Sequence, residues 1–157
     1  MAQLRPVLLV EDSPNDIELT MVALEKSRLA NPVVVARDGV EALDFLFRRG
    51  NEATDEVPQL PAVVLLDIKL PRMDGLEVLQ EIRREPRTQK VPVVMLTSSR
   101  EEQDLIRSYG FGVNAFVVKP VGHREFFDAI RDIGAFWAVL NEPPPELAGK
   151  DCLGEGS

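Results

Sequence analysis

Cysteine and histidine are nearly absent from this chain, which narrows the chemistry that it can perform. Its 157 residues include one cysteine, Cys152, and one histidine, His123. Because Cys152 has no disulfide partner within the chain, we expect the protein to reside in a reducing compartment and predict a cytoplasmic location. No second kind of metal ligand lies beside His123 in the sequence, so we interpret it as a surface residue at the start of a helix.

Long apolar runs and clusters of positive charge are also missing. No hydrophobic segment approaches the roughly 18 residues that a membrane-spanning helix needs, and Met1 to Pro6 is too short and polar for a signal peptide. The formal net charge is -8 and the sequence pI is about 4.7. A chain of this charge repels phosphate backbones unless it has a local basic patch, and we find none. We therefore expect neither membrane insertion nor direct binding to nucleic acid.

What the chain does contain is enough apolar material for one compact domain. Hydrophobic residues make up 45% of the sequence, which is sufficient to build a core without disulfides. We place this domain at residues 1–140. The prolines and glycines that follow predict a disordered C-terminal tail at residues 141–157.

Short apolar runs alternate with segments of helical periodicity. Five continuous runs have the pattern of strands buried on both faces, namely residues 7–10, 33–35, 63–66, 91–96 and 115–118. Five helices are predicted between and after them. Two of them are residues 39–48 and 123–140. The other three are marked by Ile17, Met21 and Leu24; by Leu76, Leu79 and Ile82; and by Leu105, Ile106 and Tyr109. This alternation predicts an α/β protein with a doubly wound, five-stranded parallel sheet, arranged as a flavodoxin-like three-layer sandwich.

Polar residues end four of the predicted strands and form the candidate site. They are Glu11 and Asp12 after the first strand, Asp67 after the third, Thr97 after the fourth and Lys119 after the fifth. The carboxyl ends of parallel strands lie along one edge of the sheet, so we expect these side chains to converge. Three crowded carboxylates repel one another unless a cation lies between them, and a set of oxygen ligands favours Mg²⁺. Because Mg²⁺ bound in this way also coordinates phosphate oxygens, phosphate is the expected substrate group.

A carboxylate in such a site can attack phosphorus and form an aspartyl-phosphate. Asp67 is the expected nucleophile because it lies in the middle of the set, whereas Glu11 and Asp12 are adjacent, as metal ligands often are. The ammonium group of Lys119 would neutralise charge on the transferring group. The hydroxyl of Thr97 would hydrogen-bond a phosphoryl oxygen only once one is present, which makes Thr97 a candidate sensor.

Four segments of this sequence together resemble one protein family, the response-regulator receivers of two-component signalling. They are Leu8–Asp12, Leu66–Gly75, Met95–Ser98 and Phe116–Pro120, within a resemblance that extends from Val7 to about Leu140. The resemblance implies a single receiver domain whose Asp67 accepts a phosphoryl group from a sensor histidine kinase in phosphorelay signalling. It also implies a phosphoacceptor rather than an enzyme, although one that assists its own phosphorylation and dephosphorylation.

The family resemblance also implies roles within the site. Asp12 and Asp67 are implied to ligate Mg²⁺, with Glu11 helping through water and the backbone carbonyl of Lys69 completing the protein ligands. In the family, the aromatic residue three positions before the lysine, here Phe116, turns inward when the threonine moves toward the phosphoryl group. Phe116 lacks the hydroxyl of the tyrosine often found there, so burial of the ring would have to drive that movement.

A more detailed resemblance is to the small stand-alone receivers that partner cyanobacterial and bacterial phytochromes. It rests on Ala42–Leu46 followed by Arg48–Gly50, on the long polar loop Asn51–Pro61, and on Phe136 and Trp137. The loop is longer than most connections in α/β proteins, so we interpret it as an insertion, either functional or merely solvated. This resemblance implies that the partner kinase is a bacteriophytochrome.

Three other functions fit parts of this pattern. A Mg²⁺-dependent phosphohydrolase also has an aspartyl nucleophile on a strand end, but it needs a second acid two residues later, where this chain has Lys69. A scaffold that has kept the fold but lost phosphorylation should lack at least one of the five site residues, and all are present. A transcription factor would need a further domain after the fifth helix, where we predict only the tail.

The predicted fifth helix has more apolar surface than one buried side requires. One stripe, at about 100° per residue, is expected to pack on the sheet, and it comprises Phe126, Ile130, Ile133, Trp137 and Leu140. Phe127 and Phe136 lie on either side of that stripe, so another segment or molecule must cover them. Either the tail from Asn141 folds over these aromatics or a second copy does. We favour a homodimer through the fourth helix, fifth strand and fifth helix, with Phe127, Phe136 and Trp137 at the interface.

Overall fold

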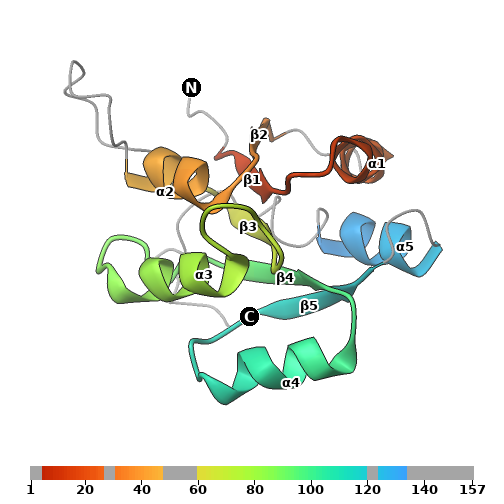
Figure 1. Cartoon of the computed structure of the whole chain (residues 1–157). Helices are drawn as coiled ribbons and strands as arrows, with labels where there is room; N and C mark the ends of the chain where they lie inside the picture. The colour runs from red at the N-terminus through yellow and green to blue at the C-terminus, as the bar shows by residue number, and fades with distance from the viewer. Residues whose placement is uncertain (1–4, 27–30, 48–59, 120–123, 134–157) are drawn as a thin grey trace, which may run out of the picture.

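The computed structural model of this chain describes residues 5–26, 31–47, 60–119 and 124–133. Strands and helices alternate along these residues (Figure 1). The strands are β1 (Val7–Val10), β2 (Val33–Ala36), β3 (Val63–Asp67), β4 (Val93–Thr97) and β5 (Ala115–Val118). The helices are α1 (Pro14–Lys26), α2 (Gly39–Phe47), α3 (Gly75–Arg84), α4 (Arg100–Ser108) and α5 (Arg124–Ile133).

The five strands form one parallel sheet in the order β2-β1-β3-β4-β5. Strand β3 is central, and its Asp67 is aligned with Leu96 of β4. The chain moves outward from β1 to β2 and then returns to the other side of β1, which is the flavodoxin-like arrangement with its switch point between β1 and β3. The predicted fold is therefore confirmed, and the carboxyl ends of β1 and β3 lie side by side where ligands bind in such sheets.

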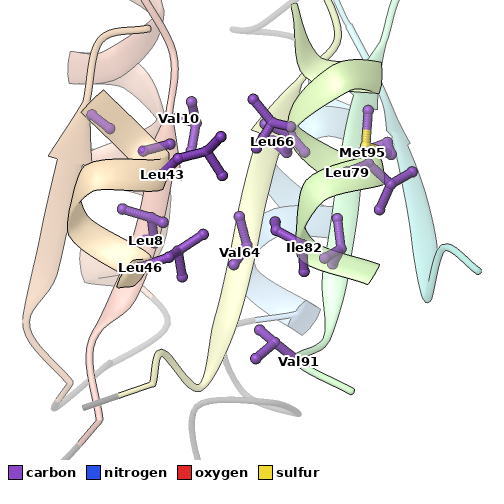
Figure 2. Packing of buried hydrophobic residues seen from close by; sticks show 14 of the residues in the cluster. Leu8, Val10, Leu43, Leu46, Val64, Leu66, Leu79, Ile82, Val91 and Met95 are labelled. Carbon is purple, nitrogen blue, oxygen red and sulfur yellow. The ribbon is translucent and has the colours of Figure 1, made fainter. Parts of the chain in front are cut away.

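Two apolar clusters, one on each face of the sheet, hold the layers together. In the first, Leu43 and Leu46 of α2 and Leu79 and Ile82 of α3 pack on β1, β3 and β4 (Figure 2). Helices α1 and α5 cover the opposite face (Figure 1), where their side chains, including Phe126, belong to the second cluster. Alternate residues of the central strands contribute to the two clusters because side chains of a strand point to opposite faces. Each large apolar side chain buried in this way stabilises the fold by roughly 1.5–3 kcal/mol.

Three of the apolar side chains that mark the predicted helices lie on the surface. Met21, Leu105 and Tyr109 are 37%, 49% and 52% exposed, respectively. In α1 the buried side chains are Ile17, Thr20, Ala23 and Leu24. Helix α4 lies beside the edge strand β5 and buries only Ile106 among its residues (Figure 1). An edge strand offers a helix less apolar surface than a central pair of strands, so the rest of this face is left to solvent.

The fourth strand begins later than predicted, whereas the described part of the fifth helix agrees with its predicted pattern. The fourth strand begins at Val93 rather than Val91, since Pro92 has no N–H to donate and the N–H of Val91 closes a turn with the carbonyl of Thr88 (3.0 Å). Helix α5 has the expected buried stripe, with Phe126, Ile130 and Ile133 in the core.

Several predicted features lie outside the described residues. They are Arg48–Gly50, most of the polar loop, His123, Phe136, Trp137, Leu140 and the tail with Cys152. Of the helices that the structure does describe, none is both long and apolar enough to cross a membrane.

Two glycines allow backbone segments to approach closely at the carboxyl edge of the sheet. A Cβ atom on Gly75 would lie 2.2 Å from the carbonyl oxygen of Asp67, and one on Gly39 would lie 2.3 Å from the carbonyl oxygen of Met73. Gly75 also donates its N–H to the carbonyl of Ile68 (2.9 Å), which closes the loop between β3 and α3. These contacts determine where Asp67 lies relative to α3.

We predict that Gly75→Ala destabilises the fold by about 3 kcal/mol, the upper end of the usual range for overpacking, because the obstacle is backbone. The measurement is urea denaturation followed by circular dichroism. Gly110→Ala is the matched control. Gly110 has a φ of 68° and nothing within 4 Å of an added Cβ, so this variant should lose only about 1 kcal/mol through backbone strain. A Gly75→Ala protein as stable as wild type would contradict the packing argument.

Candidate functional site

The first strand ends in a turn that presents two acids, Glu11 and Asp12. Ser13 then caps α1, because its hydroxyl accepts the N–H of Asp16 (3.3 Å), and Pro14 begins the helix, where its missing N–H is no loss. The N–H of Ser13 donates to the Glu11 carboxylate (3.2 Å) and helps to hold that side chain. Glu11 is 1% exposed, whereas Asp12 is exposed. The turn therefore offers one buried and one accessible carboxylate.

Asp67 is the last residue of the central strand and is 4% exposed. The N–H of Lys69 points back to it and donates to Oδ1 (3.4 Å). The Lys69 side chain extends into solvent and forms an ion pair with Glu102 of α4 (3.4 Å). Glu102 also accepts the N–H of Ser98 (2.7 Å), so it connects the loop after β3 to the end of β4. The backbone of Lys69 therefore lies close to the Asp67 carboxylate, whereas its side chain does not.

Lys119 joins the ends of separate strands. It follows β5, and its N–H donates to the carbonyl of Thr97 (2.7 Å). Its ammonium nitrogen lies 3.1 Å from a carboxylate oxygen of Glu11 and 3.1 Å from one of Asp67. A third oxygen, Oδ2 of Asp16, is 3.3 Å away. One largely buried cation thus forms ion pairs with acids from β1, β3 and α1.

Asp16 is the site residue that the sequence did not reveal. It lies in the first turn of α1 rather than at a strand end. An acid at this position is ordinarily explained by the helix dipole or by an N-terminal cap, three residues after a serine such as Ser13. Because this ordinary explanation is sufficient, the sequence gives no sign of the contact between Asp16 and Lys119, which the fold shows.

The three acids predicted to hold a cation lie together. One carboxylate oxygen from each of Glu11, Asp12 and Asp67 lies within 4.8 Å of the other two. Mg²⁺ binds oxygen at about 2.0–2.1 Å, so two ligand oxygens around one ion lie at most about 4.2 Å apart, which is close to the upper limit of this group. This group contains no histidine or cysteine, and its all-oxygen donor set fits Mg²⁺ or Mn²⁺ better than zinc.

Burial and crowding make the negative charges at this edge unfavourable without a cation. Burial, and then the charge of Asp67, raise the pKa of Glu11 to about 7, although the ammonium group of Lys119 opposes this. Burial alone would lower the pKa of Lys119, but the charges of Asp67 and Glu11 outweigh it and leave that pKa raised. At neutral pH and without metal, Lys119 is therefore charged while Glu11 is partly protonated.

Thr97 and Phe116 lie on the two strands beyond Asp67. The hydroxyl of Thr97 is buried and, among the described residues, has no hydrogen-bond partner. An unsatisfied buried hydroxyl costs roughly 1–3 kcal/mol, so this group is suited to a ligand oxygen that arrives at the sheet edge. Phe116 is half-buried against the first apolar cluster, and the guanidinium carbon of Arg107 lies 4.6 Å from its ring centroid. That distance is within the range of a cation–π contact.

We predict that Glu11→Gln stabilises the metal-free protein at pH 8, by at most about 3 kcal/mol. Above pH 7, folded wild type holds an ionised Glu11 in an unfavourable environment, and glutamine removes that charge. As the pH falls from about 7 to the ordinary glutamate value of 4.5, the folded wild type binds a proton that the unfolded chain does not yet bind. The stability of the wild type therefore rises and the difference between the two proteins disappears.

Urea denaturation in excess chelator at several pH values between 4.5 and 8 measures this effect. Glu18→Gln is the control, since Glu18 lies on the exposed face of α1, and it should change stability little at any pH. If Glu11→Gln were less stable than wild type at pH 8, its ion pair with Lys119 would outweigh burial and the prediction would be wrong.

Comparisons with known proteins agree with this geometry. The family model for the response regulator receiver domain matches residues 7–131. The response regulator Rcp1 of Synechocystis sp. is 38% identical over 131 residues, which span 83% of this chain and 87% of Rcp1.

Solved structures show the same similarity. The bacteriophytochrome response regulator AtBRR is 63% identical with a TM-score of 0.73, over 90% of this chain and 100% of that one. The Mn²⁺-bound form of Rcp1 is 35% identical with a TM-score of 0.75, over 90% of this chain and 99% of that one. The phosphorylated cyanobacterial phytochrome response regulator RcpA is 36% identical with a TM-score of 0.76, over 92% of this chain and 100% of that one.

Proposed function

We infer that this chain, which belongs to the response regulator receiver domain family, accepts a phosphoryl group on Asp67 from a sensor histidine kinase. The resulting change of shape would carry the signal onward in a phosphorelay. The observation that supports this most strongly is the convergence of Asp67 with Lys119, Glu11 and Asp12 at one edge of the sheet. Apart from Glu11 and Asp12, no two of these four residues are neighbours in the sequence.

The proposed transfer needs positive charge around Asp67. One of its oxygens attacks the phosphorus of a phosphohistidine, a P–O bond forms, the P–N bond breaks, and the imidazole nitrogen keeps the electron pair. The ammonium group of Lys119, 3.1 Å from Asp67, would stabilise charge on the phosphoryl oxygens. Mg²⁺, held by Asp12, Asp67 and the Lys69 carbonyl with help from Glu11 through water, would supply further positive charge. We propose that the protein assists its own phosphorylation and dephosphorylation without acting as an enzyme on other substrates.

Thr97 and Phe116 are the proposed switch residues. The Thr97 hydroxyl would gain its missing hydrogen bond from a phosphoryl oxygen on Asp67, and movement of Thr97 would free space for the ring of Phe116. Since phenylalanine has no hydroxyl, the ring would be driven inward by burial alone. The half-buried position of Phe116 supports this, because the ring has further surface to bury.

A bacteriophytochrome is the proposed partner kinase. The support is the similarity to AtBRR and to the phytochrome response regulator RcpA over nine-tenths of this chain. We propose a cytoplasmic location for this pair of proteins, on the single cysteine and the acidic composition.

A phosphohydrolase remains less consistent with the site. The position two residues after Asp67 would have to supply an acid, and Lys69 instead extends to Glu102 with a side chain that is 76% exposed. Transfer to Asp67 followed by signalling therefore fits better than turnover of a small phosphate ester.

We predict that acetyl phosphate with Mg²⁺, or a phosphorylated histidine kinase, adds one phosphoryl group to the wild type. Asp67→Asn should abolish this labelling because an amide is a poor nucleophile toward phosphorus, and excess chelator should stop it in the wild type. Intact-protein mass spectrometry measures the modification. Asp44→Asn, an acid of α2 away from the site, is the control and should label normally. Full labelling of Asp67→Asn, or undiminished transfer in chelator, would refute the assignment.

A homodimer through α4, β5 and α5 is also proposed. Exposed apolar side chains lie on this face, with Leu105 and Tyr109 on α4 and Val118 on β5 about half exposed. Phe127 of α5 is half-buried against the second apolar cluster, so part of its ring is open to a partner. Phe136 and Trp137, the other proposed interface residues, lie outside the described residues. Because Phe116 is on β5, its movement would alter the same face, and dimer affinity would depend on phosphorylation of Asp67.

We predict that sedimentation of the wild type shows a dimer at micromolar concentration. Leu105→Glu and Phe136→Glu should each give folded monomers, since a buried unpaired carboxylate opposes association. Met21→Glu is the matched control, because Met21 is an exposed apolar residue of α1, outside the proposed interface, and it should remain dimeric. A wild type that stays monomeric both before and after phosphorylation would rule the dimer out.

A further inference from the structure

Arg72 has an unusual backbone conformation for its residue type. Among the described residues it is the only one besides glycine with a positive φ, 67°. An L residue in this left-handed region is strained relative to glycine. Arg72 lies in the loop between β3 and α3 and is exposed, so burial does not offset the strain. Another contact must hold the loop in this conformation.

That contact is a bidentate ion pair with Asp38. The Nε of Arg72 lies 3.0 Å from Oδ2 of Asp38, and Nη2 lies 3.0 Å from Oδ1, so each carboxylate oxygen accepts a hydrogen bond. The Asp38 side chain is 18% exposed and the Arg72 side chain 60%, so the ion pair lies at the surface of the protein. Asp38 precedes α2, so the ion pair joins the loop after β2 to the loop after β3.

Asp38 is itself held in place. Its Oδ1 accepts the N–H of Glu41 (2.8 Å) and caps the first turn of α2. Burial works to raise the pKa of Asp38, but the hydrogen bonds from the Glu41 amide and from Arg72 outweigh it and hold that pKa below its usual range. The carboxylate that binds Arg72 is therefore a fixed anion at the N-terminus of α2.

The two loops also touch through their backbones. A Cβ on Gly39, the residue after Asp38, would lie 2.3 Å from the carbonyl oxygen of Met73, the residue after Arg72. The N–H of Met73 in turn donates to the carbonyl of Pro71 (2.7 Å). The ion pair and the backbone contact thus hold the middle of the β3–α3 loop against α2.

We propose that the Arg72–Asp38 ion pair is a positioning clamp that raises the affinity of the site for Mg²⁺ without touching the metal. This inference rests on the proposed function, in which Asp67 and the Lys69 carbonyl are ligands carried at the start of the clamped loop. The N–H of Lys69 donates to Asp67 (3.4 Å), so movement of the loop reaches the carboxylate directly. A loop held in the binding conformation loses less conformational freedom when the ion binds.

The variant Arg72→Gly distinguishes an effect of the ion pair on Mg²⁺ affinity from an effect on the stability of the fold. Glycine adopts a φ of 67° without strain, so relief of strain offsets the lost exposed ion pair and the melting temperature of the metal-free protein should change little. The Mg²⁺ affinity, measured on the full chain by isothermal titration calorimetry, should nevertheless fall about threefold to fivefold. Asp38→Asn keeps an oxygen for the α2 cap and should give a similar loss. The double variant should lose no more than either single variant, because both remove the same contact.

Arg84→Ala is the matched control. It removes another exposed ion pair, with Glu81 at 3.0 Å, at the far end of α3, and it should leave Mg²⁺ affinity unchanged. Unchanged affinity in Arg72→Gly and Asp38→Asn, with a wild type that binds Mg²⁺ and is phosphorylated on Asp67, would overturn the clamp and leave the proposed function standing. An equal loss in Arg84→Ala would overturn it as well. A wild type that binds no Mg²⁺ would overturn the proposed function and the clamp together.

Discussion

The ammonium group of Lys119 is the contact on which the rest of the site depends. It lies within 3.3 Å of carboxylates of Glu11, Asp16 and Asp67, although Lys119 and Glu11 are 108 positions apart in the sequence. With Asp12 beside them, one cation faces four acids, and the edge of the sheet keeps an excess of negative charge. That excess is the physical reason why we propose a metal at this place. A second cation would be needed before a doubly charged phosphoryl group could approach Asp67.

The parallel sheet is what makes such crowding possible. Strands β1, β3 and β4 are buried along their whole length, so the chain can place charged side chains only where these strands end. Helices begin at the same edge, capped by Ser13 before α1, Asp74 before α3 and Ser99 before α4. Their N-termini contribute partial positive charge toward the acids. The glycines that bring loop backbones together, Gly39 and Gly75, then leave little freedom in how the acids are arranged.

The sequence predicts those parts of the molecule that depend on local pattern. Continuous apolar runs predict the strands, and the polar residues that end four of these strands predict the residues of the site. Asp16 was missed because its position in a first helical turn has an ordinary explanation, and the Arg72–Asp38 pair was missed because it joins two loops of different crossovers. Helical periodicity does not show how much sheet surface a helix will meet, so the sequence did not indicate that Leu105 is half exposed. In each case the deciding fact is a neighbour that is remote in the sequence.

Besides burial of the Phe116 ring, the magnitudes of two contacts bear on the direction in which the proposed switch would move. A buried hydroxyl without a partner, as at Thr97, leaves roughly 1–3 kcal/mol to be gained when a phosphoryl oxygen arrives. The contact of Arg107 with Phe116, which an inward movement of the ring would break, stabilises an exposed site by only about 0.5–1 kcal/mol. The difference, on the order of 1–2 kcal/mol, changes a population ratio by roughly fivefold to thirtyfold. Phosphorylation would therefore shift the population of Phe116 rather than lock it, and the side of α4 that carries Arg107 would report a graded change to whatever binds there.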